Sequence, residues 1–510
     1  MPKIKKALIS LSDKSNLLPL LKCLKRHKIN IISSGGTYKI IKKLKFNCSE
    51  ISDFTKFPEI LNGRVKTLHP KIHAGILSKR KNKKHIQELK KNKFENIDLI
   101  IVNFYPFEQV VKKSKSHQKI IENIDIGGPT MVRAAAKNYN DVTVLTSIHQ
   151  YEQLISELIT NRGSTSLNFR QKLSEEAFAE TAYYDSVISS YFNKISKISF
   201  PHKKIIHGNL IEKLRYGENP HQEGWFKGNL EEVFSQLHGK QISYNNLLDI
   251  DAAIMLMEDF SNAPPTFAIL KHNNACGFAT RSNLLEAYGA ALQADPISAF
   301  GGILIANNQI DLETATKINT LFCEVVIAPS YDLEALELLK SKKNRIILVQ
   351  NKINFPNQIE RSCLNGILVQ ERDVYLESVS SFELKTDTKP SDSQMEDLNF
   401  ANKLAKHTKS NTIVLVKDLQ LLASGTGQTS RVDALNQAIN KAKAFNFDLT
   451  GSVMASDAFF PFPDCVEIAG KEGINAVIQP GGSIKDDLSV DYCNKNQIGM
   501  VFTGIRHFKH

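Results

Sequence analysis

Short apolar runs that stop abruptly at glycine or polar residues recur along the whole chain, and this pattern constrains the fold most strongly. Near the start, residues 6–12 predict a strand, residues 13–27 an amphipathic helix, and residues 29–32 a second strand. A strand, a helix and a strand in this order form a βαβ unit, the building block of α/β proteins. Ligands of α/β proteins usually bind beyond the carboxyl ends of strands, so the polar residues after each run are the functional candidates.

The composition fits a globular protein of several domains. At about 150 residues per domain, 510 residues predict about three domains. The net charge of +12 raises the hypothesis of a nucleic-acid or membrane partner. The charges are spread along the chain, however, and the densest basic run, 79–93, contains no Phe, Trp or Tyr for stacking. We therefore expect no nucleic-acid and no membrane partner; steeply salt-dependent affinity for DNA or RNA would identify the alternative.

The cysteines indicate the compartment. Seven cysteines without a CxxC pair argue against a disulfide framework or a zinc ribbon, and for a reducing, cytoplasmic location. The apolar patch within residues 1–14 is too short for a signal peptide, and no run approaches the roughly 18 apolar residues of a membrane span. We expect a cytoplasmic protein without a bound metal.

A lysine and a histidine follow one of the apolar runs directly. Residues 267–270 (FAIL) predict a buried strand that stops at Lys271 and His272. A histidine can move a proton near neutral pH, and a neighbouring ammonium can stabilise a developing oxyanion. The alternative is a solvated pair at the start of a loop, and the pair alone does not decide between them.

Two segments near the N-terminus are suited to bind a phosphate. The SSGGT turn at residues 33–37 leads from a strand into a helix and offers free backbone N–H groups at the positive end of a helix dipole. The alternative is an ordinary capped helix start. Residues 64–77 (RVKTLHPKIHAGIL) then concentrate cations that would repel one another without an anion between them. A solvated basic loop is the alternative there.

Residues suited to acid–base chemistry also occur in the first part of the chain. The apolar run 97–103 ends just before Tyr105, and the segments IDIGGPTM and RAAAKN supply Asp125 and Lys137. With Lys66 they form a carboxylate, a phenol and two lysines, which can transfer protons without a metal.

These motifs resemble a known family. In order, SLSDK, SSGGT, GRVKTLHPKIHAGIL, NFYPF, IDIGGPTMVRAAAKN and TAYYDS resemble the inosine monophosphate (IMP) cyclohydrolase domain of the bifunctional purine-biosynthesis enzymes. The resemblance implies a doubly wound parallel sheet like that of methylglyoxal synthase over residues 1–198. It implies that Lys66, Tyr105, Asp125 and Lys137 surround the ring-closing chemistry. It implies nucleotide binding by Ser12, Lys14, Ser34, Gly36, Thr37, Arg64, Lys66 and Thr67.

The second part of the chain begins after a predicted linker at residues 199–208. RYGENP and the asparagine pair 245–246 offer groups for a phosphate and a carboxamide, although RYGENP also suits a surface turn. The glycine-rich GTGQTSR at 425–431 is a weak signal alone. Pairs of apolar run and polar stop continue at 295–306, 325–331, 409–417, 452–464, 476–487 and 500–510.

Together these segments resemble the other half of the same enzymes, aminoimidazole carboxamide ribonucleotide (AICAR) transformylase, over residues 209–510. In that family this half consists of two α/β units related to cytidine deaminase, without its zinc. The resemblance implies catalytic roles for Lys271, His272 and Asn411. It implies nucleotide binding by Arg215, Tyr216, Asn246, Arg506 and Phe508, and a folate pocket around Ser298, Phe300, Glu324 and Pro461.

The implied function is therefore two consecutive reactions on one chain. The formyl group of 10-formyltetrahydrofolate passes to AICAR, and the product is cyclised and dehydrated to IMP, with no metal and no NAD. The resemblance also implies a homodimer.

The chain departs from the family pattern at Ala275 in place of proline, at Ala423 and Thr426 in the glycine-rich loop, and at Pro463 in place of arginine. These departures motivate a second hypothesis, a relative that retains only the cyclohydrolase, and separate assays of the two reactions would distinguish them.

Overall fold

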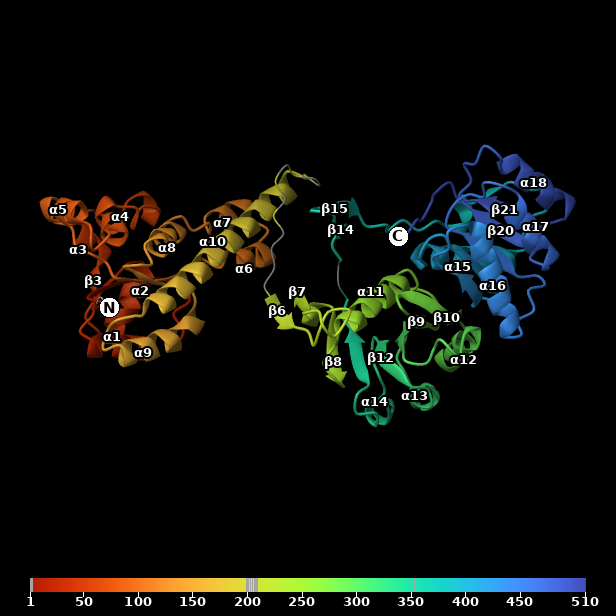
Figure 1. Ribbon diagram of the computed structural model, residues 1–510, viewed down its shortest axis with the longest axis horizontal. Helices are drawn as coiled ribbons and strands as arrows, with labels where there is room; N and C mark the ends of the chain where they lie inside the picture. Colours follow the sequence, from red (N-terminus) through yellow and green to blue (C-terminus); the bar gives the residue numbers. More distant parts are fainter. Residues whose placement is uncertain (1–2, 199–200, 202, 204, 206–209, 353–354) are drawn as a thin grey trace. The chain divides into compact units, whose positions relative to one another are not determined.

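The computed structural model describes residues 3–198, 201, 203, 205, 210–352 and 355–510. The chain divides into two compact units, Met1–Gly208 and Asn209–His510 (Figure 1). The linker expected over residues 199–208 lies largely outside the described residues. Within the described ranges, no helix is long and apolar enough to cross a membrane.

The first unit is built on a sheet of five parallel strands in the order β3-β2-β1-β4-β5. The chain winds outward from β1 in one direction and from β4 in the other, so the sheet is doubly wound, as the family resemblance implies. Leu8 on β1 pairs with Ile32 on one side and Ile100 on the other, and all three are buried. The strands are β1 (Lys6–Leu11), β2 (Asn30–Ser33), β3 (Ser49–Glu50), β4 (Leu99–Asn103) and β5 (Thr143–Leu145).

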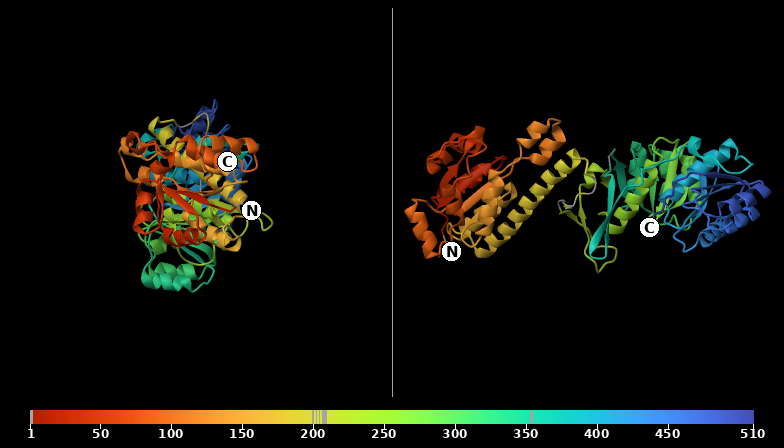
Figure 2. Two further views of the ribbon diagram at one scale, coloured as in Figure 1. Left: turned by 90° about the vertical axis from the view of Figure 1, so that its left-hand side faces the viewer. Right: turned by 90° about the horizontal axis from the view of Figure 1, so that it is seen from above.

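Amphipathic helices join and cover these strands. In α1, leucines at 17, 20, 21 and 24 are buried, which gives the helix one apolar face against the core. The long helix α10, visible in the right-hand view of Figure 2, packs against α8 and β5. The helices are α1 (Leu17–Arg26), α2 (Gly35–Lys43), α3 (Ile51–Thr55), α4 (Pro70–Leu77), α5 (Lys83–Lys91), α6 (Phe107–Lys113), α7 (His117–Ile121), α8 (Gly127–Lys137), α9 (Tyr151–Thr160) and α10 (Leu167–Ile195).

The second unit contains the same succession of elements twice in one continuous sheet. Its strand order is β16-β21-β20-β19-β17-β18-β10-β9-β11-β12-β13-β8, and the copies meet where β10 pairs with β18 in antiparallel fashion. The first copy is β8 (Phe234–His238), α11 (Tyr244–Glu258), β9 (Thr266–Lys271), β10 (Asn274–Thr280), α12 (Leu284–Ala294), β11 (Gly302–Ala306), α13 (Leu312–Asn319), β12 (Cys323–Ala328), α14 (Leu333–Lys340) and β13 (Ile346–Gln350). The second is β16 (Glu383–Leu384), α15 (Asp392–His407), β17 (Ile413–Lys417), β18 (Gln420–Gly425), α16 (Arg431–Ala444), β19 (Val453–Ser456), α17 (Asp464–Lys471), β20 (Ala476–Gln479), α18 (Asp486–Lys495) and β21 (Gly499–Phe502).

The core of this unit follows the duplication. One face of the sheet packs against α11 and α15 together, in a single apolar cluster to which both copies contribute. The opposite face forms two clusters, one under α12 to α14 and one under α16 to α18. Two short hairpins lie outside the large sheet, β6 (Leu210–Lys213) with β7 (Trp225–Lys227), and β14 (Gln358–Cys363) with β15 (Gly366–Glu371).

Candidate functional site

A cavity of about 620 Å³ lies at the carboxyl ends of β2, β1 and β4 in the first unit. This is the point where the winding of the sheet reverses, and such switch points are the usual binding crevices of open parallel sheets. Most residues predicted for the cyclohydrolase line it, namely Ser12, Lys14, Ser34, Gly36, Thr37, Arg64, Lys66, Thr67, Tyr105 and Asp125.

The SSGGT turn forms one wall of this cavity. Helix α2 begins at Gly35, and the first backbone N–H groups of a helix have no partner within it. Thr37 fixes the turn to β1, because its Oγ1 accepts a hydrogen bond from the Leu11 N–H (2.9 Å) and donates one to the Leu11 carbonyl (3.1 Å). The start of α8 also lines the cavity, so two helix dipoles present their positive ends to it. This arrangement is suited to bind a phosphate.

Three cations lie around the same cavity. Lys14 donates to the Ser12 carbonyl at 2.9 Å, Lys66 lies 2.7 Å from a carboxylate oxygen of Glu59, and Arg64 pairs with Glu122. Exposed ion pairs of this kind stabilise a protein by only about 0 to 1 kcal/mol. An entering phosphate can therefore replace the carboxylates as the partner of Lys66 and Arg64.

Asp125 is the carboxylate of this cavity. It precedes α8, and its Oδ1 accepts a hydrogen bond from the Gly128 N–H at 2.8 Å. Burial raises its pKa, and hydrogen bonds from the backbone of Gly128 and Tyr105 oppose that rise. A half-buried carboxyl group with a raised pKa, with a phenol lining the same cavity, is suited to proton transfer.

Lys137 is placed differently from the other predicted residues of this unit. It is the last residue of α8 and is exposed, whereas the cavity lies at the first residue, Gly127. A rise of 1.5 Å per residue separates the two ends of the helix by roughly 15 Å. The catalytic role of Lys137 stays a prediction from the resemblance, without support from the cavity.

In the second unit, Lys271 is the last residue of β9, and His272 and Asn273 form the tight turn to β10. His272 and Asn273 both have positive φ, 49° and 65°, as in a two-residue hairpin turn. His272 is exposed, while the Lys271 ammonium donates to the Phe300 carbonyl at 2.8 Å. The Asn273 N–H donates to Asp249 on α11 at 2.7 Å. The turn thus presents an imidazole to solvent and keeps an ammonium beside it.

The loop before β17 approaches this turn from the second copy. The Lys409 N–H donates to Asn274 Oδ1 at 3.1 Å, so the loop that carries Asn411 contacts the first residue of β10, two residues after His272. Asn411 Nδ2 donates to the Gln428 carbonyl at 2.9 Å, so the glycine-rich segment 425–431 lies here as well. The structure therefore brings together the hairpin turn, the loop of Asn411 and a motif that is weak alone.

The residues predicted to bind the nucleotide in this unit differ in their surroundings. Arg215 lies over the ring of Tyr216, with the guanidinium carbon 4.6 Å from the centroid, and is exposed. Asn246 is buried and closes a capping box with Ser243 at the start of α11, which engages its Oδ1. Because the Oδ1 of Asn246 is engaged in the capping box, its Nδ2 is the atom that could contact a ligand.

The residues predicted for the folate pocket lie on several segments. Phe300 is exposed and packs against Phe322 at 5.1 Å between ring centroids, next to the carbonyl that Lys271 contacts. Glu324 pairs with Lys240 at 2.5 Å in a separate cavity of about 430 Å³. Ser298 follows the anchored Asp295, whereas Pro461 is an exposed residue of the loop after β19.

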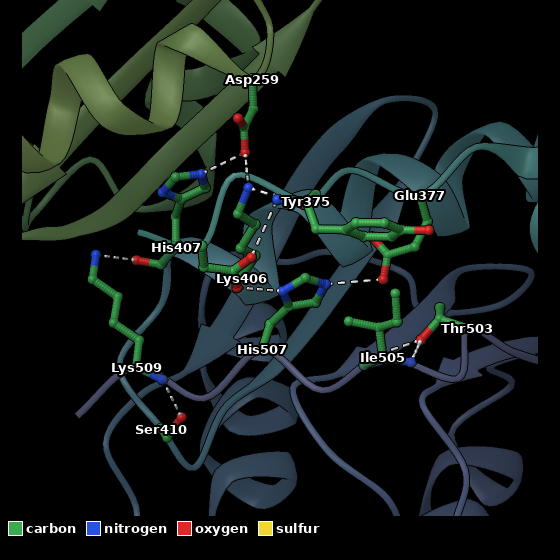
Figure 3. A network of polar contacts seen from close by, with 11 residues as sticks. Asp259, Tyr375, Glu377, Lys406, His407, Ser410, Thr503, Ile505, His507 and Lys509 are labelled. Carbon is green, nitrogen blue, oxygen red and sulfur yellow. Dashed lines mark hydrogen bonds and ion pairs between the residues drawn. The ribbon is translucent and has the colours of Figure 1, made fainter. Parts of the chain in front are cut away.

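The C-terminal segment is held by a polar network around the buried ring of His507, shown in Figure 3. His507 lies 2.6 Å from Asp373 and 2.9 Å from Glu377. The Lys509 N–H donates to Ser410 Oγ at 3.0 Å, directly beside Asn411. The segment that carries the predicted binders Arg506 and Phe508 is therefore fixed beside the loop of Asn411.

Several residues at these sites were not predicted from the sequence. Arg431 lies at the start of α16 with its guanidinium carbon 5.7 Å from the Phe508 ring, so it joins Arg506 there. Arg431 is the last residue of the GTGQTSR motif, but a glycine-rich motif alone does not predict that its arginine belongs to a site. Asp249 and Asp373 gave no signal, because lone acidic residues are common on helices and loops.

No group of three or more side chains suited to hold a metal occurs in the part of the chain that the structure describes. The fold and the two sites define an α/β enzyme with one site in each unit. The first site is a cation-rich cavity at a switch point, and the second is a lysine–histidine turn in a duplicated sheet.

Comparison with known proteins specifies this class. Residues 135–441 match the family model of the AICARFT/IMPCHase bienzyme, and residues 16–130 match that of the MGS-like domain. The bifunctional purine biosynthesis protein PurH of Bacteroides thetaiotaomicron is 54% identical over 508 residues, covering 100% of this chain and 99% of the relative. The proteins of the same name from Persephonella marina and Aquifex aeolicus are 47% and 46% identical, each covering 99% of this chain and 100% of the relative. The chain belongs to the AICARFT/IMPCHase bienzyme family.

Membership confirms the predicted family, the fold class and the prediction of a bifunctional enzyme of purine biosynthesis. A relative that retains only the cyclohydrolase is not favoured, because the bifunctional proteins match over their full length. The family also implies small-molecule substrates and a folate-type formyl donor.

Proposed function

We propose that residues 209–510 transfer the formyl group of 10-formyltetrahydrofolate to AICAR, and that residues 1–198 close the product to IMP. The observation that carries this assignment is the separation of the two sets of side chains. The lysine–histidine turn belongs to the second unit, and the cation-rich cavity belongs to the first.

For formyl transfer, the amine of AICAR is a poor nucleophile and must lose a proton as it attacks the formyl carbon. His272 is exposed on its turn and takes that proton. Lys271 stabilises the tetrahedral oxyanion or helps protonate the leaving folate nitrogen. The guanidinium groups of Arg431 and Arg506 both lie near the ring of Phe508, and they bind the nucleotide phosphate. Proton transfer of this kind is typically worth about 10² to 10⁴ in rate.

For cyclisation, the carboxamide nitrogen of formyl-AICAR attacks the formyl carbon of the same molecule, and water leaves. Because the reaction is intramolecular, much of the barrier is lowered by positioning. The amides at the start of α2, with Lys14 and Arg64, hold the phosphate. Lys66 stabilises developing negative charge, while Asp125 and Tyr105 orient the amide and shuttle protons.

The remaining assignments rest on the family. The protein acts as a homodimer in the cytoplasm, with Ser298, Phe300, Glu324 and Pro461 around the folate. Nucleic acid and membranes are not its partners.

Formyl transfer and cyclisation are tested separately on the full chain. Supplied with AICAR and 10-formyltetrahydrofolate, the protein is expected to form IMP. The His272→Ala variant should form none, yet should still cyclise formyl-AICAR that is supplied directly.

Asp418→Ala is the matched control and should keep formyl transfer, because Asp418 is the first residue of the turn after β17, as His272 is the first residue of the turn after the equivalent strand β9. Full formyl transfer by His272→Ala, or loss of cyclisation in that variant, would contradict the assignment.

A further inference from the structure

The duplication of the second unit extends to the hairpin turn that carries the candidate catalytic residues. In the first copy, His272 and Asn273 have φ of 49° and 65°. In the second copy, Asp418 and Leu419 occupy the turn between β17 and β18, with φ of 53° and 52°. Each turn directly follows a lysine, and neither contains a glycine, the residue that adopts positive φ without strain.

Each turn is also held by a carboxylate at an equivalent position. Asp249, the sixth residue of α11, accepts a hydrogen bond from the Asn273 N–H at 2.7 Å. Asp397, the sixth residue of α15, accepts hydrogen bonds from the N–H groups of Asp418 at 2.9 Å and Leu419 at 2.6 Å. Burial raises the pKa of both carboxyl groups, and these hydrogen bonds oppose the rise.

The carboxylates compensate for the missing glycines. Two consecutive left-handed residues with side chains persist only where the surroundings hold them in place. A hydrogen bond from a backbone amide to a carboxylate is about twice as strong as one between neutral groups. A hydrogen-bonded carboxylate therefore holds each turn in place, from α11 in the first copy and from α15 in the second.

The two copies differ in what the turn carries. In the second copy, the turn is tied to the end of β10, because the Thr280 N–H donates to the Leu419 carbonyl at 3.0 Å and Arg281 donates to the Asp418 carbonyl at 2.7 Å. In the first copy, the turn carries an exposed His272 next to Lys271. The turn of the second copy therefore joins the two halves of the sheet, whereas the turn of the first copy exposes a candidate catalytic side chain.

We propose that Asp249 is a positioning residue for formyl transfer, which acts by holding the turn that presents Lys271 and His272. This inference rests on the proposed function of the second unit. Asp249 bonds the amide of Asn273, so it acts through the turn and not on the reacting atoms. Asp397 performs the same structural task in a turn without a candidate catalytic residue.

The test measures formyl transfer by full-length variants, with cyclisation of supplied formyl-AICAR as the readout of the intact first unit. In Asp249→Ala, kcat for formyl transfer should fall about 100-fold, as expected when a reacting group moves by about 1 Å. The KM for AICAR should change little, because the phosphate contacts lie elsewhere. Asp249→Asn retains an acceptor oxygen for the Asn273 amide and should restore most of the activity.

Asp397→Ala is the matched control, since it removes the equivalent carboxylate. It should lower the thermal stability as much as Asp249→Ala does, and it should leave kcat for formyl transfer unchanged, because no reacting group moves. Equal loss of kcat in both variants would overturn the inference, because the carboxylates would then be merely structural. Full activity of Asp249→Ala would overturn it as well.

If Asp249→Ala does not fold, Asp249→Glu decides. It keeps the charge and shifts the acceptor by one methylene group. A kcat that falls in Asp249→Glu but not in Asp397→Glu supports the inference, and an equal fall in both variants, or in neither, contradicts it. A wild-type protein that does not transfer formyl at all would instead refute the proposed function.

Discussion

At the scale of single residues, His507 has the most unusual environment in the C-terminal segment. Its ring is buried between Asp373 and Glu377, with one carboxylate at each nitrogen. Burial alone lowers the pKa of the imidazole, but the hydrogen bonds and charges of the two carboxylates outweigh it and raise the pKa to about 9. The histidine is therefore protonated at neutral pH in the folded chain.

We predict that this cluster makes the stability of the second unit fall at alkaline pH. The folded-state pKa of about 9 exceeds the unfolded value, so the contribution is complete below about pH 6.5 and is lost as the pH rises through about 9. The shift corresponds to about 3 kcal/mol. Urea unfolding of wild type and His507→Gln between pH 6 and 10 measures it. The difference between the two proteins should shrink between about pH 6.5 and 9 and level off above that range, and a difference that stays constant from pH 6 to 10 would contradict the prediction.

Asp125 allows a second prediction for one residue. Asp125→Asn retains an oxygen that can cap α8 through the Gly128 N–H, but it cannot carry a negative charge. We expect cyclisation of supplied formyl-AICAR to slow by about 10² to 10⁴, the usual contribution of a general acid or base. Formyl transfer should be unchanged in the same preparation, since Asp125 belongs to the other unit. An unchanged cyclisation rate would show that the charge of Asp125 is not needed.

At the scale of elements, the start of α8 depends on glycine. A Cβ added to Gly128 would lie 2.5 Å from Asp125 Oδ2, closer than real contacts allow. Gly128→Ala should therefore lower the free energy of unfolding by about 1 to 3 kcal/mol and displace Asp125, which should slow cyclisation.

Gly289 lies in the middle of α12, and a Cβ added to it would have nothing within 4 Å. Gly289→Ala should stabilise the protein by about 0.5 to 1 kcal/mol, because alanine has the higher helix propensity. Thermal unfolding measures whether Gly128→Ala lowers the stability and Gly289→Ala raises it.

Helices and strands could be predicted wherever the local sequence determines them. The apolar runs predicted β1, β2, β4 and β9, and the SSGGT turn predicted the start of α2. Contacts between distant segments were not predictable in this way. The bond from Lys409 to Asn274 joins residues 135 positions apart, and the bond from His507 to Asp373 joins residues 134 apart. Such pairs depend on how distant segments of the chain pack together, which no local pattern contains.

The duplicated unit illustrates the same limit within a single site. The Lys271–His272 pair stood out because a histidine after an apolar strand has recognisable chemistry. Asp249 did not, because its partner is a backbone N–H on another element. The likeness of the two copies became evident from the strand order and the turn dihedrals, since His272 and Asp418 share a position but differ in chemistry, as do Asn273 and Leu419.

At the scale of the whole molecule, the two units have separate apolar cores and separate sites. A substitution that inactivates one site therefore leaves the other folded and active. His272→Ala should be unable to form formyl-AICAR, and Lys66→Ala should be unable to use it. We predict that neither variant alone forms IMP from AICAR and 10-formyltetrahydrofolate.

An equimolar mixture of the two variants should form IMP after a lag, because formyl-AICAR made by Lys66→Ala must accumulate in solution before His272→Ala can bind it. The lag should shorten as the concentration of the mixture rises, since the intermediate then accumulates faster. A chain that carries both substitutions, added at the same total concentration, is the control and should form none. A mixture that stays inactive, while each variant still performs its own half-reaction, would show that the intermediate is not released and would overturn the independence of the two sites.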